Sequence, residues 1–168
     1  MSAIQALKMA RAAGVRIGID GDALTLNADA APPPDVLKLL SLHKEQVIAL
    51  LRPGGDGWSG EDWRCFFDEW AGIAKFDRGL PRDQAEARAL ACCVTEWLNR
   101  NPVRSPPGGC LGCGEAESGQ DPLLPFGVEP TGHAWLHSRC WAAWHASRKA
   151  EAVAILSTFG IPDMRILP

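Results

Sequence analysis

The sequence predicts an α+β protein made of two small modules joined by a linker. Residues 15–27 contain two short runs in which apolar and polar side chains alternate around Gly21-Asp22, a pattern typical of a β-hairpin. Apolar residues recur at helical spacing before and after these runs, which predicts helices on both sides. Residues 53–60 are rich in glycine, so we expect them to link a module of residues 1–52 to a module of residues 61–168.

The first module is expected to follow the order helix, strand, strand, helix, helix. Ser2 can cap the first helix, and Gly14 can end it. Asp35 is the predicted cap of a later amphipathic stretch, which Ser41 could divide into two short helices. The predicted elements are a helix over 2–14, strands over 15–20 and 23–27, a proline-rich connector over 28–34 and helical sequence over 36–51.

The second module is expected to be mainly helical and rich in tryptophan. One predicted helix starts near Ser59 and ends at Gly79, a second runs from Arg82 to Arg100, and a third from Ser138 to Phe159. The first presents an aromatic face of Trp63, Phe66, Phe67, Trp70 and Ala74, the second an apolar stripe of Ala89, Leu90, Cys93, Val94 and Trp97, and the third a stripe of Trp141, Trp144, Ala152, Ile155, Leu156 and Phe159. Cys65, Cys92 and Cys93 lie within apolar helical sequence and are interpreted as small packing residues.

Composition narrows the classes of function. The 168 residues carry a net charge of −3, so the chain has no overall excess of positive charge for binding nucleic acid. Its apolar runs are too short to span a membrane, and its first residues lack the pattern of a signal peptide. Six cysteines in such a chain favour a reducing compartment, so we expect a cytoplasmic protein whose thiols stay free or bind metal.

Two pairs of metal-ligand residues give the strongest chemical signal. Cys110 and Cys113 form a Cys-x2-Cys pair flanked by glycines, and His137 and Cys140 form a His-x2-Cys pair further on. Together they predict a Cys3His zinc site, and four protein ligands leave no position for a reactive water, so the zinc would be structural. His133 is an alternative fourth ligand. The other interpretation is a set of reduced cysteines without metal, although paired cysteines in a polar loop differ from typical core cysteines.

The order of these ligands resembles a treble-clef zinc finger. A glycine-bordered knuckle is followed by a stretch over residues 123–136 that is compatible with a short hairpin turning near Thr131-Gly132. A helix then begins at the second ligand pair. The resemblance implies that this helix carries both His137 and Cys140 in its first turn.

The first module resembles the TubC-type N-terminal docking domain known from assembly-line megasynthases. Residues 14–26, 34–40 and 44–51 carry the resemblance through hydrophobic spacing and glycine positions. It implies an αββαα fold that tends to form homodimers and whose hairpin receives a short peptide of a partner protein by strand addition. No synthetase or carrier-protein sequence follows, so only the docking behaviour is carried over. The predicted partner-binding residues are Val15, Ile17, Ile19, Leu24 and Leu26, although this face could instead cover the module's own helices and leave the backbone edge to bind.

We therefore expect a non-enzymatic adaptor with a structural zinc ion. The alternative is an accessory protein that binds nucleic acid weakly through Arg139, Arg148 and Lys149 beside two tryptophans. Residues 61–168 also resemble uncharacterised proteins carried by bacterial mobile elements, a resemblance that implies no activity. An enzyme is not expected, because Glu115, Glu117 and His145 do not form a recognised hydrolase motif and the glycine-rich linker lacks the features of a phosphate-binding loop.

Overall fold

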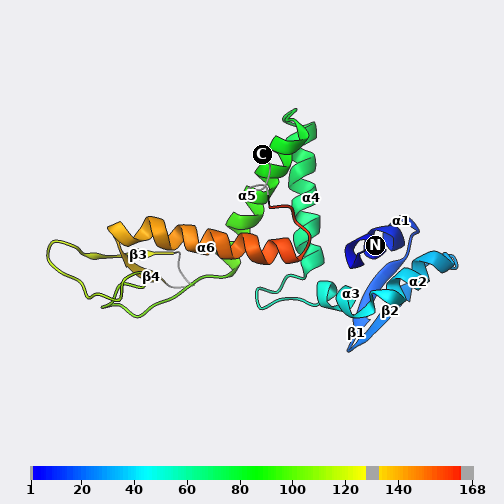
Figure 1. Ribbon diagram of the computed structural model, residues 1–168, viewed down its shortest axis with the longest axis horizontal. Coiled ribbons are helices and arrows are strands. Elements are labelled where there is room, and N and C mark those ends of the chain that lie inside the picture. Colours follow the sequence, from blue (N-terminus) through cyan, green and yellow to red (C-terminus); the bar gives the residue numbers. More distant parts are fainter. Residues whose placement is uncertain (1, 128–132, 164–168) are drawn as a thin grey trace.

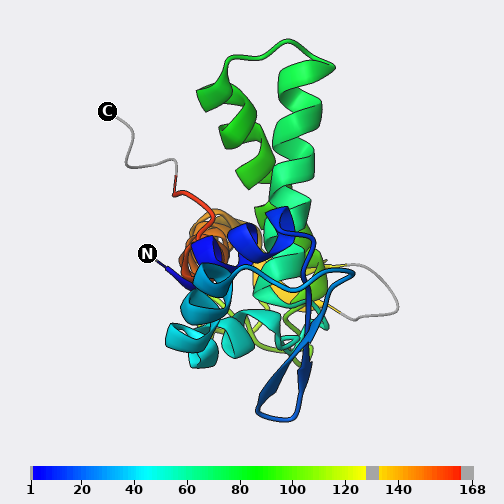
Figure 2. The same cartoon turned by 90° about the vertical axis from the view of Figure 1, so that its right-hand side faces the viewer.

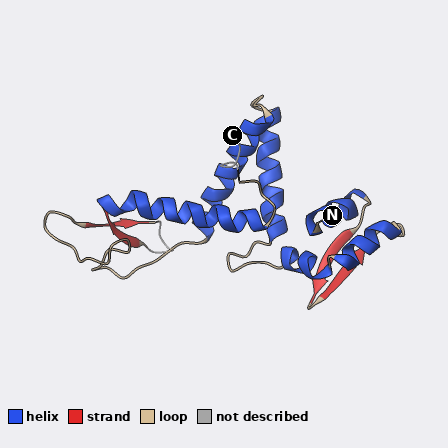
Figure 3. Ribbon diagram, in the orientation of Figure 1, coloured by secondary structure: helices blue, strands red, loops and turns tan. Residues whose placement is uncertain are grey.

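A computed structural model describes residues 2–127 and 133–163 of the chain. Within these residues it contains six helices and two separate antiparallel hairpins, a content that is compatible with the α+β class (Figures 1 and 3). The elements are α1 (Ala3–Ala12), β1 (Arg16–Asp20), β2 (Ala23–Asn27), α2 (Pro34–Leu42), α3 (Lys44–Leu51), α4 (Gly60–Phe76), α5 (Arg82–Arg100), β3 (Leu123–Phe126), β4 (Ala134–His137) and α6 (Ser138–Thr158). No helix among the described residues is long and apolar enough to cross a membrane.

In the N-terminal unit, α1 and α3 pack against the β1–β2 hairpin, and α2 packs against these two helices (Figure 1). Ser2 caps α1 as predicted, through a reciprocal pair of hydrogen bonds with Gln5. Two predicted boundaries were wrong. Helix α2 already begins at Pro34, where a missing N–H costs nothing, so Asp35 lies in the first turn instead of capping it. The break between α2 and α3 falls at His43, not at Ser41, because the His43 backbone leaves the helical region.

The β1–β2 hairpin projects from this unit (Figure 2). Ile17 pairs with Leu26 and Ile19 with Leu24, so these four side chains share the face turned toward the helices. The turn places Gly21 at φ +58°, a conformation that glycine adopts without strain. Arg52, which follows α3, donates to the Gly21 carbonyl oxygen at 3.1 Å and pairs with Asp22, which fixes the tip of the hairpin.

Helices α4 and α5 form an antiparallel pair, and α6 crosses it near one end (Figures 1 and 2). The bounds of α5 agree with the prediction, and all five residues of its predicted stripe are buried. On α4, Trp63, Phe67 and Ala74 are buried, while Phe66 and Trp70 are half-buried. Cys65 is exposed, so its interpretation as a packing residue was wrong.

Helix α6 does not present one continuous stripe, as the sequence analysis expected. Its first half contributes Trp141 and Trp144 to the packing of the β3–β4 hairpin. Its second half buries Ala152 and Leu156 against α4 and α5. The helix therefore connects the hairpin at one end to the α4–α5 pair at the other (Figure 1).

The segment expected to be a linker is a short structured loop. The Gly54 N–H donates to the Trp58 carbonyl at 2.7 Å, and Pro53 forms a bridge with Ser59, which caps α4. The Trp58 ring packs edge-on against Trp63 at 4.7 Å.

The N-terminal unit also contacts the helices that follow this loop. Arg11 of α1 forms an ion pair with Glu61 of α4. A Cβ atom built on Gly60 would lie 3.1 Å from Leu50 of α3, and one on Gly160 would lie 2.3 Å from Ile4 of α1. The two parts of the chain thus approach each other closely at both glycines.

Candidate metal centre

Four ligand-type side chains converge where the 110–114 knuckle meets the start of α6. The ligand atoms of Cys110, Cys113, His137 and Cys140 all lie within 4.8 Å of one another. Cys110 and His137 are buried, Cys140 is half-buried and Cys113 is exposed. These are the four residues that the sequence analysis selected as metal ligands.

The knuckle is closed by backbone hydrogen bonds. The Gly114 N–H donates to the Cys110 carbonyl at 2.7 Å, and the Leu111 N–H ties the knuckle to β4 by donating to the Trp135 carbonyl at 2.9 Å. Gly112 allows the close approach of α6, because a Cβ atom there would lie 2.9 Å from Cβ of Cys140. These contacts hold both knuckle sulfurs toward the end of β4.

His137 reaches the site from a strand, not from the helix. It is the last residue of β4, pairs with Leu123 of β3 and has an extended backbone, whereas Cys140 lies in the first turn of α6. The expectation that the first turn of the helix carries both ligands was therefore wrong. The imidazole of His137 is only 1% exposed, because the hairpin covers it.

The two nitrogens of His137 face different partners. Nδ1 lies 3.5 Å from the Cys113 sulfur, inside the group of ligand atoms. Nε2 lies 3.8 Å from Oδ2 of Asp121. Arg139 holds this carboxylate at 2.6 Å through Nε and binds Glu115 at 2.6 Å through Nη2. One arginine thus fixes two carboxylates beside the ligands, one at the histidine and one at Cys113.

The thiols have opposite tendencies to ionise. Burial acts to raise the pKa of Cys110, but the backbone N–H groups of His137, Cys113 and Gly112 point at its sulfur and lower its pKa to about 6. Burial and the two neighbouring thiols raise the pKa of Cys140 to about 11. Three adjacent thiolates repel one another, so a bound cation would favour ionisation of all three.

Sulfur and imidazole donors at this spacing fit a metal ion. Three sulfurs and one nitrogen suit tetrahedral coordination, and the amide-rich knuckle already stabilises one thiolate. His133 does not belong to this group of ligand atoms. Its carbonyl accepts from the Ser105 N–H at 3.0 Å, and its ring lies 6.4 Å from Trp135. The Thr131-Gly132 turn expected beside it lies outside the described residues.

Asp121 is the site residue that sequence reasoning missed. It stands 16 positions before His137, and no spacing rule connects them. They meet because Leu123, two residues after Asp121, pairs with His137 across the β3–β4 hairpin. Glu115 and Arg139 were considered only for other roles.

The predicted partner-binding residues differ in accessibility. Val15 is 1% exposed and lies in the core, so its side chain is not available at the surface. Ile17 and Leu24 are half-buried and pack against the same core. Ile19 is half-buried and does not pack against that core, and Leu26 is 41% exposed.

Two of the three predicted nucleic-acid-binding cations are paired with carboxylates. Arg139 binds Asp121 and Glu115, and Arg148 binds Glu151. Lys149 is exposed.

Comparison with known proteins found no match: no family model fits the chain, and neither the curated proteins nor the solved structures contain a significant relative.

Proposed function

We propose that this protein is a non-enzymatic adaptor that binds a partner protein by strand addition at the β1–β2 hairpin. The observation that carries the proposal is the isolation of this sheet. It has two strands, and among the described residues no backbone group outside the hairpin bonds to either strand over residues 16–27. Unpaired strand edges of this kind accept an extended peptide.

The surroundings of the hairpin support this role. Arg52 holds the tip, so the strands present a fixed template instead of a loose loop. Ile19 and Leu26 lie on one face outside the main core of the unit, where alternate side chains of an added strand can pack. The TubC-type resemblance of residues 1–52 implies the same mode of binding and a tendency to form homodimers.

The metal centre has a structural role in the same proposal. We assign the ion as zinc, held by Cys110, Cys113, His137 and Cys140 in a treble-clef-like arrangement. Four protein ligands fill a tetrahedral shell, so the ion links the knuckle, β4 and α6 without an open position for substrate. Such a link stabilises a region with a small apolar core.

The test uses affinity capture with the full chain and two variants. Leu26→Lys places a charge on the hairpin, whereas Leu42→Lys places the same charge on the exposed end of α2 and is the matched control. We expect one partner protein to be lost with the first variant and retained with the second. With the reconstituted pair, hydrogen exchange should slow at the amides of one hairpin edge.

Two other outcomes would count against strand addition. Equal capture by both variants would place the binding surface elsewhere, and recovery of nucleic acid without a specific protein would favour the alternative function. Sedimentation velocity of the same proteins tests self-association. A dimer that Leu26→Lys disrupts would identify a second copy of this chain as the partner.

A further inference from the structure

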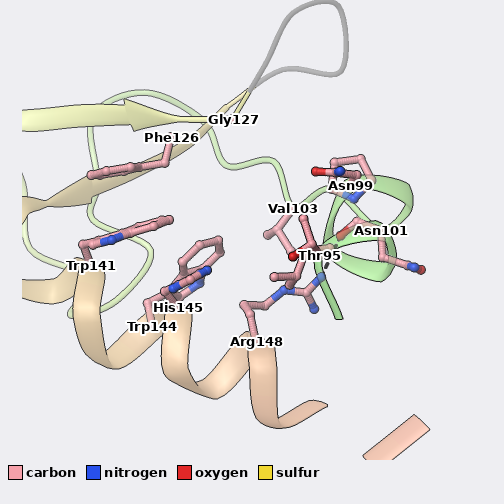
Figure 4. A pocket seen from close by; sticks show the side chains of 12 residues that line it. Thr95, Asn99, Asn101, Val103, Phe126, Gly127, Trp141, Trp144, His145 and Arg148 are labelled. Atoms are coloured by element: carbon pink, nitrogen blue, oxygen red, sulfur yellow. Dashed lines mark hydrogen bonds between the residues drawn. The ribbon is translucent and has the colours of Figure 1, made fainter. Parts of the chain in front are cut away.

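A cavity of about 310 Å³ lies between the end of α5, the end of β3 and the middle of α6 (Figure 4). Its floor is one face of α6, formed by four residues at positions i, i+3, i+4 and i+7: Trp141, Trp144, His145 and Arg148. None of the four is a candidate metal ligand, so this cavity is separate from the metal centre.

Aromatic rings dominate one side of the cavity. Phe126 of β3 stacks on Trp141 with ring centroids 4.2 Å apart, and His145 stacks on Trp141 at 4.7 Å. The Trp144 ring lies 5.6 Å from Trp141 and is tilted by 36°. All four rings are half-buried, because they border an open space instead of filling it. Planar apolar surfaces of this kind favour a planar aromatic ligand.

Polar groups stand on the opposite side, where Figure 4 shows Thr95 and Asn99 across the cavity from the rings. The Asn101 carboxamide turns away from the rings and donates through Nδ2 to the Trp97 carbonyl at 2.9 Å. The Asn99 carboxamide carries both donors and an acceptor. Carboxamides recognise the hydrogen-bonding edges of heterocyclic bases.

The described residues that line the cavity carry one charge. It belongs to Arg148, and none of these residues within 2–127 and 133–163 is acidic. The guanidinium donates to the Asn101 carbonyl at 2.6 Å, pairs with Glu151 and lies over the Trp97 ring. A cationic ligand would find no carboxylate among these described lining residues, and a phosphate would find an arginine that is already paired.

We infer that this cavity binds an uncharged nucleobase, stacked beside Trp144 and His145 and hydrogen-bonded through its edge to Asn99. Its volume is at the small end of the range for ligand pockets, about 300–1,000 Å³, which suits one or two fused rings. The base could belong to a free nucleoside or to a single-stranded nucleic acid. The inference does not depend on the docking role of the hairpin.

The experiment titrates the metal-loaded full chain with adenosine, guanosine, cytidine, uridine and ribose, and follows the indole N–H signals of Trp141 and Trp144 by NMR. At least one nucleoside should shift both signals, and ribose should shift neither. Asn99→Leu, which removes the edge contact, and Val103→Phe, which fills the cavity, should each weaken binding by about tenfold or more. Gln84→Leu is the control, because it removes a carboxamide from the exposed surface of α5; it should leave nucleoside binding unchanged.

A six-nucleotide single strand of the preferred base distinguishes the two sources. If the strand binds more tightly than the nucleoside and its affinity falls as the salt concentration rises, the base belongs to a nucleic acid. Equal or weaker binding would assign it to a free nucleoside. The inference is overturned if no nucleoside shifts the indole signals at millimolar concentration, or if Asn99→Leu and Val103→Phe bind as the parent does. Tighter binding of N-acetyltryptophanamide than of every nucleoside would also overturn it, in favour of an aromatic side chain from a partner protein.

Discussion

Asp121 lies 3.8 Å from Nε2 of His137, while Nδ1 of the same imidazole lies 3.5 Å from the Cys113 sulfur. The ring therefore turns one nitrogen to the ligand group and the other to a carboxylate. The 3.8 Å separation is longer than a hydrogen bond, so the contact is electrostatic. A carboxylate beside the second nitrogen of a ligating histidine favours the proton on that nitrogen. This geometry therefore favours Nδ1 as the atom that binds the metal in the proposed zinc site.

Replacing Asp121 should weaken metal binding without removing a ligand. We expect Asp121→Ala to lower zinc affinity by about 10- to 100-fold, because His137 loses the group that orients it. Competition with a chromophoric chelator measures the affinity. Glu117→Ala, a carboxylate removed from an exposed position between Cys113 and Asp121, is the control and should have no effect.

The nitrogen assignment has a separate readout. Long-range ¹H–¹⁵N correlation spectra of the zinc-loaded protein should show His137 with its proton on Nε2. A proton on Nδ1 would reverse the assignment and remove the role given to Asp121.

Removing a metal ligand should unfold only part of the second module. Cys140→Ser is expected to abolish stoichiometric zinc binding and to increase hydrogen exchange in the knuckle and the β3–β4 hairpin. The second half of α6 should stay protected, because Ala152 and Leu156 are buried against α4 and α5. The N-terminal unit should also keep its protection. One zinc per chain in this variant, by elemental analysis, would contradict the assignment.

Local sequence patterns predicted α5 and the four ligand positions because each depends on spacing within one segment. The α5 stripe follows helical periodicity, and each ligand pair has a two-residue gap. The place of His137 on β4 and its contact with Asp121 could not be predicted in this way. Both depend on the register of the β3–β4 hairpin. Its strands are short, and their described residues show neither an alternation of apolar and polar side chains nor a turn motif that would fix the register.

Cys65 and α6 show two other causes of error. Cys65 follows Trp63 by two residues, which places it about 200° around the helix from the aromatic face, so the helical pattern itself indicated exposure. On α6, the sequence shows apolar residues along the helix but not which neighbour each half contacts. That information comes only from the tertiary structure.

The close packing of the first residue of α4 against the end of α6 should tolerate no side chain at Gly60. We expect Gly60→Ala to lower the free energy of unfolding by about 1–3 kcal/mol, since the new methyl group would meet Phe159 at 2.5 Å. Urea denaturation measures the change. Gly72→Ala on the same helix is the matched control: nothing lies within 4 Å of its Cβ position, so it should raise stability by up to about 1 kcal/mol. If both variants lost the same free energy of unfolding, the cause would be a general effect of alanine in α4 and not the contact with Phe159.

The Arg11–Glu61 ion pair should contribute little net stability at neutral pH. Burial raises the pKa of Glu61, and this effect exceeds the lowering by Arg11. Because the folded pKa lies above the unfolded one, the folded state binds the proton more tightly, and stability declines as pH rises through this range. Glu61→Gln removes that penalty, so at pH 7 it should be neutral or stabilising by less than about 1 kcal/mol.

The pH dependence of the free energy of unfolding distinguishes a burial penalty on the Glu61 carboxylate from a general effect of the mutation. The advantage of Glu61→Gln over the parent should be present at pH 7 and disappear as the pH falls to about 4, where Glu61 is protonated. Glu69→Gln, at an exposed position of α4, should show no such trend. A loss of more than about 1 kcal/mol at pH 7 would mean that attraction to Arg11 outweighs burial.

Alkylation should separate the six cysteines into four groups. Cys65 is exposed and should react first with iodoacetamide at pH 7.5, before the half-buried Cys92. Burial raises the pKa of Cys93 to about 12, so its thiolate fraction is about a thousandfold below that of an ordinary thiol, and it should react only after unfolding. The three candidate metal-binding cysteines should be protected by zinc and become reactive after a chelator is added. Peptide mass spectrometry over time measures the order, and reaction of these three at the same rate with and without chelator would show that no metal holds them.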